Sequence, residues 1–284
     1  MIAFLGMGLL GSNFTRALAR RGEVVQVWNR SPEKARAVAA EVGGKALEDP
    51  AAAVRGAARV HLTLTDDAAV DEVLERARPG LAQGMVVVDH TTTSPAGAAA
   101  RLRRWTERGI SFLHAPVFMG PKMALESQGL MLASGDRALF DRLEPELSRM
   151  TGKFLYVGAE PHLAAAYKLL GNHFLITMTA GLRDTLALAK GMGLRSSDVE
   201  ALVAAFNPAA ALGQRLTRLL TAGRGQTSWG LAMARKDTRL MLEAASAGGV
   251  PLEIIPVVAR MMDRWLAEGH GAEDWTVIAR DVVE

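Results

Sequence analysis

The sequence has 284 residues, 49% of them hydrophobic, and a formal net charge of only +3. This length and composition exclude a disordered chain and allow one large or two ordinary domains with a packed core. The arginines are dispersed rather than gathered into a basic stripe, which argues against nucleic-acid binding. Cysteine is absent and the six histidines show no metal-ligand spacing, so neither disulfides nor a metal site is predicted.

The start of the chain carries no secretory signal pattern, and no later run is long and apolar enough to span a membrane. We therefore expect a cytoplasmic protein without membrane partners.

A glycine-rich turn follows the first apolar run. Residues 2–5 predict a strand and residues 12–21 a helix, with the sequence GMGLLG between them. Strand, glycine turn and helix in this order are typical of a dinucleotide site, where the helix N-terminus offers free amides to a pyrophosphate. A purely structural turn is the alternative. The candidate cofactor residues here are Gly6, Met7, Gly8, Leu9, Leu10 and Gly11.

The residues after the second predicted strand, 24–28, indicate which nucleotide is bound. An NAD site usually has an acidic residue there, whereas this chain has Asn29, Arg30 and Ser31. A guanidinium can bind a 2′-phosphate, which favours NADP(H). Alternatively, or in addition, Ser31 caps the following helix and Pro32 begins it.

Helical and strand-like segments alternate through the first 160 residues, which predicts a Rossmann-type, doubly wound and mostly parallel sheet. Ligands bind beyond the carboxyl ends of such strands. Two loops there are rich in polar residues: 65–67, which lies near the cofactor or caps a helix, and 89–95. The predicted helices are 33–42, 49–55, 68–76, 96–108 and 137–150, and the predicted strands are 60–64, 85–88, 110–112, 130–133 and 154–157.

Residues 161–191 predict a long central helix that is apolar almost all round and therefore buried. It joins the first domain, 1–160, to an all-α domain, 161–284. Lys168 and Asn172 lie four residues apart, on one face of this helix. A lysine among alanines and leucines either extends its ammonium into solvent or has a depressed pKa that serves catalysis.

The remaining segments also predict helices. Ser197 and Glu200 have the spacing of a capping box, and Ser228 is placed to cap a helix over 229–247. This helix carries Lys236 and Asp237, and a further helix is predicted over 256–267.

Four motifs in this order resemble the β-hydroxyacid dehydrogenase family, which includes 3-hydroxyisobutyrate dehydrogenases and glyoxylate/succinic semialdehyde reductases and is related to 6-phosphogluconate dehydrogenase. The glycine turn resembles the family's cofactor loop, and 89–95 (DHTTTSP) is similar to its D-x-S-T-x-x-P substrate segment. Residues 167–172 (YKLLGN) resemble the K-L-x-x-N catalytic segment, and Lys236-Asp237 the later K-D pair. The resemblance covers essentially the whole chain.

The resemblance implies specific roles. Lys168 would be the general acid/base and Asn172 would hold the substrate against it. Thr65, Thr92 and Lys236 would join the cofactor residues named above. The substrate residues implied are Thr91, Thr92, Phe118, Met119, Gly120, Lys168, Asn172 and Lys236. Asp184, His90, His114 and His173 are given no catalytic role.

One segment departs from the family pattern. The family usually has A-P-V-S-G-G, whose serine and glycine amides hold the substrate carboxylate, but residues 115–121 read APVFMGP. Phe118 and Met119 either shape a more apolar substrate pocket or merely pack at the domain interface. In the first case another donor, such as Thr91, Thr92 or Lys236, has to bind the carboxylate, or the substrate is less acidic.

Three functions are therefore compared. The first is an NADP(H)-dependent oxidoreductase that interconverts a short β-hydroxyacid and its semialdehyde or keto acid. The second is an imine reductase, which the apolar pair Phe118-Met119 would suit but in which the lysine at position 168 is generally missing. The third is a non-catalytic NADP-binding protein. The Met- and Leu-rich helical half exposes more apolar surface than one domain needs, and the resemblance implies a homodimer or homotetramer.

Overall fold

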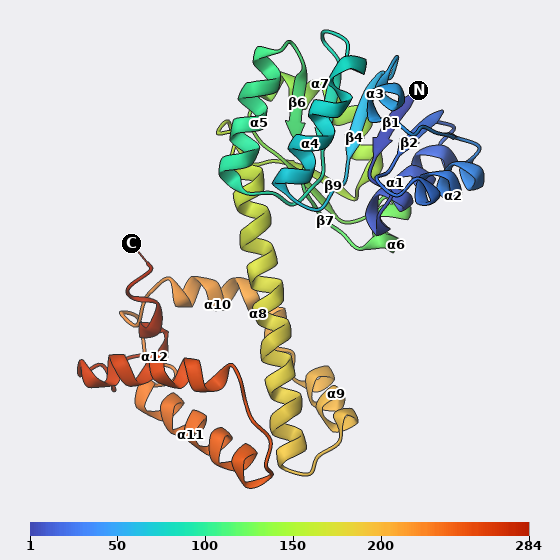
Figure 1. Ribbon diagram of the computed structural model, residues 1–284. Coiled ribbons are helices and arrows are strands. Elements are labelled where there is room, and N and C mark those ends of the chain that lie inside the picture. The colour runs from blue at the N-terminus through green and yellow to red at the C-terminus, as the bar shows by residue number, and fades with distance from the viewer. Residues whose placement is uncertain (284) are drawn as a thin grey trace. The chain divides into compact units, whose positions relative to one another are not determined.

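The computed structural model describes residues 1–283, which form two compact units. The first unit is Met1–Asn172, and the second begins at His173 (Figure 1). The division falls inside helix α8 (Leu163–Gly191) rather than at its start. The first turn of α8 packs within the first unit, because the Ala164 amide donates to the Ser134 hydroxyl at 3.0 Å and the side chain of Ala164 is fully buried.

The first unit is built on a six-stranded sheet in the order β3-β2-β1-β4-β5-β6, in which every neighbouring pair is parallel. This topology confirms the predicted Rossmann-type fold. The chain reverses its direction of winding between β1 and β4, where such sheets bind their ligands. The strands are β1 (Ile2–Leu5), β2 (Val25–Trp28), β3 (Lys45–Ala46), β4 (Arg59–Leu62), β5 (Val86–Asp89) and β6 (Ser111–His114).

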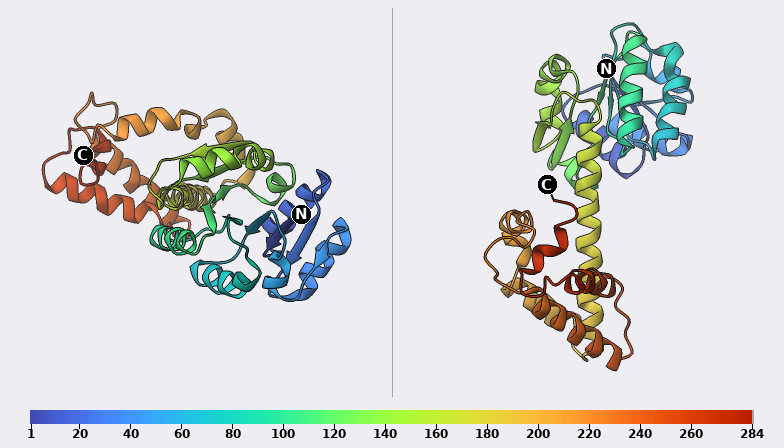
Figure 2. Two further views of the ribbon diagram at one scale, coloured as in Figure 1. Left: turned by 90° about the horizontal axis from the view of Figure 1, so that it is seen from above. Right: turned by 90° about the vertical axis from the view of Figure 1, so that its left-hand side faces the viewer.

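Helices cover both faces of this sheet (Figure 2). Alternate strand residues face opposite ways, so that Phe4 joins one core cluster while Ala3 and Leu5 join the other. Helices α1 (Leu9–Arg20), α2 (Pro32–Val42) and α7 (Arg137–Leu147) contribute to the first cluster. Helices α3 (Pro50–Val54), α4 (Asp67–Ala77) and α5 (Pro95–Glu107) contribute to the second.

A second, three-stranded sheet follows in the order β7-β8-β9. Two of its strands, β8 (Leu130–Ala133) and β9 (Lys153–Tyr156), were predicted as members of the one alternating series but belong to this separate sheet. The strand β7 (Val117–Phe118) and the short helix α6 (Pro121–Leu125) were not predicted, because neither is long enough to show a period.

Helix α1 begins earlier than predicted. It starts at Leu9 instead of Ser12, with Gly8 as the N-cap residue and no side-chain cap. Three residues of the glycine turn, Leu9, Leu10 and Gly11, are therefore already helical, and the free amides of the helix N-terminus lie directly beside Gly8. This brings the anion-binding end of the helix closer to β1 than the sequence indicated.

The described part of the second unit contains helices and no strands, as predicted. Its elements after α8 are α9 (Ser196–Ala205), η3 (Pro208–Ala211), α10 (Leu212–Leu219), α11 (Leu231–Ala247), α12 (Ile255–Ala267) and η4 (Trp275–Ala279).

Two predicted caps are wrong. The Asp198 carboxylate, not Glu200, accepts the capping bond, from the backbone N–H of Arg195 at 2.9 Å. Ser228 does not cap α11, whose N-cap residue is Gly230. The Ser228 hydroxyl instead donates to the Asp274 carboxylate at 3.0 Å. The sequence spacing could not show that a distant carboxylate competes for this hydroxyl.

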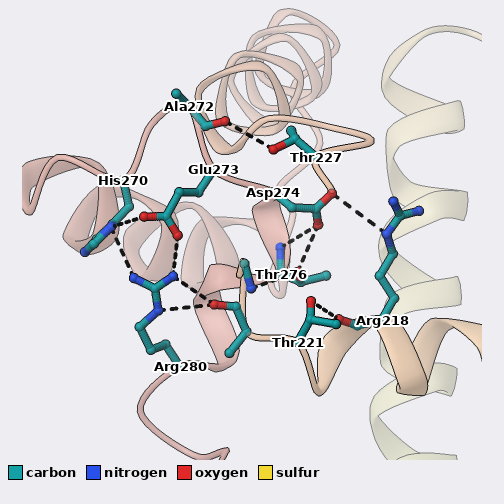
Figure 3. A network of polar contacts seen from close by, with 11 residues as sticks. Arg218, Thr221, Thr227, His270, Ala272, Glu273, Asp274, Thr276 and Arg280 are labelled. Atoms are coloured by element: carbon teal, nitrogen blue, oxygen red, sulfur yellow. Dashed lines mark hydrogen bonds and ion pairs between the residues drawn. The ribbon is translucent and has the colours of Figure 1, made fainter. Parts of the chain in front are cut away.

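A polar network fastens the C-terminal segment of the second unit (Figure 3). Asp274 accepts from the backbone N–H groups of Ser228 and Thr276, at 2.8 and 3.2 Å. Arg280 donates to the Ala222 carbonyl at 3.0 Å and pairs with Glu273. Burial alone would raise the pKa of Asp274, but these donors lower it to about 2, so the carboxylate stays ionised at neutral pH.

The prediction that the central helix is buried is wrong for its middle. Apolar side chains are exposed there at intervals of about one turn, including Leu170, Phe174 and Leu182, which are 67%, 46% and 45% exposed. Across residues 1–283, no helix combines the length and apolar character needed to cross a membrane.

Candidate active site

A cavity of about 270 Å³ lies beyond the carboxyl ends of β1, β2 and β4. It brings together seven of the predicted cofactor residues: Gly6, Met7, Gly8, Asn29, Arg30, Ser31 and Thr65. The cavity is also lined by residues that were not assigned to the cofactor: Trp28, Lys34, Thr63, Leu64, Ala69, Glu72 and Val73. Most of these could have been predicted from their positions, because they lie at the ends of β2 and β4 or in the first half of α4.

Gly6 and Gly11 are required by close backbone packing. Gly6 has φ +103°, and a Cβ there would lie 2.1 Å from the Thr63 carbonyl oxygen. A Cβ on Gly11 would lie 1.9 Å from the Gly6 carbonyl oxygen. Gly8 differs, because nothing lies within 4 Å of the place where its Cβ would be. The open space at Gly8 beside the helix N-terminus can hold a phosphate group. Gly6 and Gly11 instead allow the strand and the helix to pack closely.

The side chain of Asn29 supports the glycine turn. Its Oδ1 accepts a hydrogen bond from the Met7 backbone N–H at 2.8 Å, and its Nδ2 donates to the Ser31 carbonyl at 3.0 Å. Arg30 and Lys34 are exposed at the same cavity, and neither forms an ion pair with any residue of 1–283. No carboxylate is present at residues 29–31, directly after β2. The residues present therefore fit a phosphate-bearing nucleotide, and the cations of Arg30 and Lys34 lie at the same cavity.

The other five residues of the predicted cofactor set, Leu9, Leu10, Gly11, Thr92 and Lys236, do not line the cavity. Leu9 and Leu10 are the first residues of α1, and Gly11 is buried beneath the turn. Thr92 is exposed in the loop after β5. Thr65 does line the cavity, while its neighbour Asp66 caps α4 by accepting from the Ala69 amide at 2.8 Å.

Lys168 and Asn172 lie together on α8, as their spacing predicted. Lys168 Nζ donates to Asn172 Oδ1 at 3.0 Å, and the Lys168 residue is only 9% exposed. Burial lowers the pKa of the Lys168 ammonium below its ordinary value, because the charged form loses hydration. The lysine therefore does not extend freely into solvent, and its proton is easier to release than that of a surface lysine.

Phe118 is next to this lysine. The Lys168 Nζ lies 4.3 Å from the centroid of the Phe118 ring, within the range of a cation–π contact. Phe118, Met119 and Gly120 are all partly exposed. Phe118 thus contacts the proposed catalytic group directly, whereas the predicted alternative was simple packing at a domain interface.

Thr91 is held by the backbone around it. Its hydroxyl accepts from the Leu64 amide at 3.0 Å, and its own amide donates to Asp89 Oδ1 at 2.9 Å. Burial would raise the pKa of Asp89, but the neighbouring His114 ring, whose Nδ1 lies 3.5 Å from Oδ2, and the hydrogen bond from the Thr91 amide lower it. Thr91 therefore links the loop after β5 to the loop after β4.

A buried chain of hydrogen bonds connects β4, β5 and the segment that leads to Phe118. Arg59 Nε donates to His61 Nε2 at 2.7 Å, and His61 Nδ1 is 2.9 Å from His90 Nε2. His90 Nδ1 is 2.8 Å from the Ala115 carbonyl oxygen. A carbonyl only accepts, so His90 donates from Nδ1 and receives the Nδ1 proton of His61 at Nε2.

This arrangement satisfies both histidines in their neutral forms. Burial lowers the pKa of His90 to about 4 and that of His61 well below its ordinary value. Both rings are therefore neutral at neutral pH. Their contribution is to fix Ala115, three residues before Phe118.

The second unit holds the two remaining residues of interest. Lys236 lies on α11, where its Nζ pairs with Asp237 at 2.7 Å and its side chain is 43% exposed. Asp184 accepts from the backbone N–H groups of Glu253, Ile254 and Ile255 at the start of α12. Burial opposes ionisation of Asp184, but these donors lower its pKa, and it acts as a helix cap.

A larger cavity of about 540 Å³ in the second unit contains none of the predicted site residues, and it lies between α8, α10 and the two tryptophans Trp229 and Trp275. Within residues 1–283, no group of three or more His, Asp or Glu side chains is arranged to hold a metal ion.

Two family models together cover nearly the whole chain. Residues 1–158 match the NAD-binding domain of 6-phosphogluconate dehydrogenase, and residues 163–282 match the NAD-binding domain of NADP-dependent 3-hydroxyisobutyrate dehydrogenase.

Individual proteins are similar over the same length. An uncharacterized oxidoreductase of Shewanella frigidimarina is 30% identical over 94% of this chain and 91% of its own. The 2-(hydroxymethyl)glutarate dehydrogenase of Eubacterium barkeri is 25% identical over 98% of this chain and 93% of its own. Among solved structures, an imine reductase of Myxococcus stipitatus in complex with NADP⁺ superimposes with a TM-score of 0.89, at 21% identity and 99% coverage of both chains. At that identity the structural likeness establishes the fold alone.

Proposed function

Because the chain belongs to the 3-hydroxyisobutyrate dehydrogenase-like family of NAD(P)-dependent oxidoreductases, we propose that it interconverts a short β-hydroxyacid and its semialdehyde or keto acid, using NADP(H). The observation that carries this proposal is the Lys168–Asn172 pair, with a buried ammonium of lowered pKa at 3.0 Å from an amide oxygen. The relative named 2-(hydroxymethyl)glutarate dehydrogenase supports a hydroxyacid substrate.

The roles of the residues follow from their chemistry. When NADPH is bound, its nicotinamide supplies the hydride that reduces the carbonyl carbon. Lys168 donates a proton to the carbonyl oxygen in this direction and removes the hydroxyl proton in the other. Asn172 orients the ammonium through Oδ1, and its Nδ2 remains available to the substrate oxygen.

The preference for NADP(H) is supported by Arg30 and Lys34. Replacing both with alanine is expected to raise the Kd for NADPH at least about tenfold, because each charge-assisted bond to a phosphate contributes roughly 1.5–3 kcal/mol. The Kd for NADH should change little, since NADH lacks the 2′-phosphate. Fluorescence titration of both nucleotides measures the effect, and Arg55→Ala, at an exposed arginine away from the cavity, is the control. Equal weakening of NADPH and NADH would contradict the assignment.

The substrate class is tested by following NADPH absorbance with succinic semialdehyde, methylmalonate semialdehyde, glyoxylate and a cyclic imine. Reduction of the acid aldehydes is the expected result. Reduction of the imine alone would show that the protein is an imine reductase. The observation that favours this alternative is the aromatic ring of Phe118 beside Lys168. Nucleotide binding without turnover of any of these compounds would favour the non-catalytic alternative.

We further propose that the protein is a homodimer or homotetramer. The exposed apolar residues of α8, among them Leu170, Phe174 and Leu182, would be covered in such an assembly. Light scattering coupled to size exclusion measures the mass, and Phe174→Glu should lower it.

A further inference from the structure

The ring of Phe118 packs against two residues of α8. Lys168 Nζ lies 4.3 Å from the ring centroid. A Cβ added to Gly171 would lie 2.3 Å from Cζ and 2.5 Å from Cε1 of the ring. The edge of the ring therefore occupies the place where any other residue at 171 would have its side chain.

A glycine inside a helix is destabilising relative to alanine, because it loses more conformational freedom on folding. Gly171 lies well within α8, where no positive φ requires it. The space that it leaves is filled by Phe118. Phe118 and Gly171 thus form a matched pair in which the glycine admits the ring beside the lysine.

The backbone that carries the ring is fixed on several sides. Phe118 pairs with Leu130 in the antiparallel β7–β8 ladder, and Val117 is buried in the main core cluster. The Ala115 carbonyl is held by the neutral imidazole of His90. The backbone at Phe118 is therefore fixed, and the ring lies against α8 beside Lys168 in the side-chain conformation that the structure shows.

The Phe118 ring limits which chemical groups fit beside the reacting carbon of a substrate. A substrate oxygen has to lie within about 2.6–3.2 Å of Lys168 Nζ, which places the groups attached to the carbonyl carbon next to the ring. The face of an aromatic ring is electronegative and repels an anion. Neither Phe118 nor Met119 offers a side-chain donor to a carboxylate there, and an unpaired buried carboxylate is strongly disfavoured.

The geometry points to Phe118 as a specificity-determining residue that selects carbonyl substrates with an alkyl or aryl group beside the reacting carbon over substrates with a carboxylate in that position. The inference rests on the proposed function, because it defines the substrate class of the same site. An acid group of the substrate is accordingly separated from the carbonyl by a spacer and lies away from Phe118.

Two aldehydes of similar shape test this directly. Glyoxylate carries a carboxylate on the aldehyde carbon, and 2-methylpropanal carries an isopropyl group there. The ratio of their kcat/KM values with NADPH is independent of how much of a variant is folded. We expect the wild type to favour 2-methylpropanal by about tenfold or more, and Phe118→Ser to move the ratio toward glyoxylate by about tenfold or more.

Gly171→Ala provides a second, independent variant. Its Cβ should displace the ring and move the ratio in the same direction as Phe118→Ser. In the Phe118→Ser background, Gly171→Ala should have little further effect, because no ring remains to be displaced.

Succinic semialdehyde, whose carboxylate is separated from the carbonyl by two carbons, is included with every variant. If it is reduced while the ratio of the two test aldehydes is the same in wild type and Phe118→Ser, the specificity role is wrong and the proposed function stands. If the wild type reduces none of the carbonyl compounds, both the role and the proposed function are wrong.

Discussion

Lys168→Ala is expected to lower kcat for reduction of an aldehyde acid by about 10²- to 10⁴-fold, which is the usual contribution of general acid/base catalysis. The ammonium of Lys168 is buried, held at 3.0 Å by Asn172 Oδ1, and easier to deprotonate than a surface lysine. Removing it leaves the carbonyl oxygen without a proton donor. Steady-state NADPH oxidation measures the loss, and a nucleotide titration should show an unchanged Kd for NADPH.

Lys153→Ala is the matched control, because Lys153 is an exposed lysine at the start of β9 in the same unit. It should retain full activity. Aldehyde turnover that survives in Lys168→Ala would show that another group supplies the proton, and imine turnover that survives would support the imine reductase alternative.

The pH profile gives an independent check on the same residue. Reduction requires the ammonium form of Lys168, so its rate should fall as the pH rises through the pKa of this group. Because burial lowers that pKa below the ordinary 10.5, the descending limb should lie at a lower pH than for an exposed lysine. Oxidation of the hydroxyacid requires the neutral amine and should increase over the same interval. In Lys168→Ala both limbs should disappear.

Much of the first unit could be predicted from sequence because local signals and tertiary structure agree there. The strand at 2–5, the glycine turn and the alternation of helices and strands each indicate a Rossmann-type sheet, and the six parallel strands confirm it. The spacing of Lys168 and Asn172 was sufficient to place them together, since both lie on one helix and their distance depends on helical geometry alone.

The features that sequence could not provide depend on contacts between distant segments. The hydrogen bond between Asn29 and Met7 joins the loops that follow β2 and β1, and the contact of Phe118 with Gly171 joins a two-residue strand to the central helix. Ser228 has the sequence position of a helix cap but bonds with Asp274 far along the chain. The exposed middle of α8 was misread as buried, because an apolar sequence does not reveal which molecule covers it.

Gly6→Ala is expected to destabilise the protein by several kcal/mol and to abolish detectable NADPH binding. A φ of +103° is strained for any residue with a Cβ, by roughly 1–3 kcal/mol. The added Cβ would also lie 2.1 Å from the Thr63 carbonyl oxygen, which belongs to the backbone and cannot rotate away. The turn would have to separate from the end of β4, which carries the Met7 amide away from Asn29 and distorts the cofactor cavity.

Gly8→Ala separates this effect from the general cost of replacing glycine in the turn. Its φ is −75°, which alanine adopts without strain, and nothing lies within 4 Å of the added Cβ. Thermal unfolding should therefore show a Tm close to that of the wild type for Gly8→Ala and a much lower Tm for Gly6→Ala. Gly8→Ala places a methyl group where a phosphate is proposed to approach. Its Kd for NADPH should therefore rise while its Tm stays close to that of the wild type. Similar Tm values for the two variants would mean that the turn can accommodate a Cβ at Gly6. The backbone contact with Thr63 would then not determine the conformation of the cofactor loop.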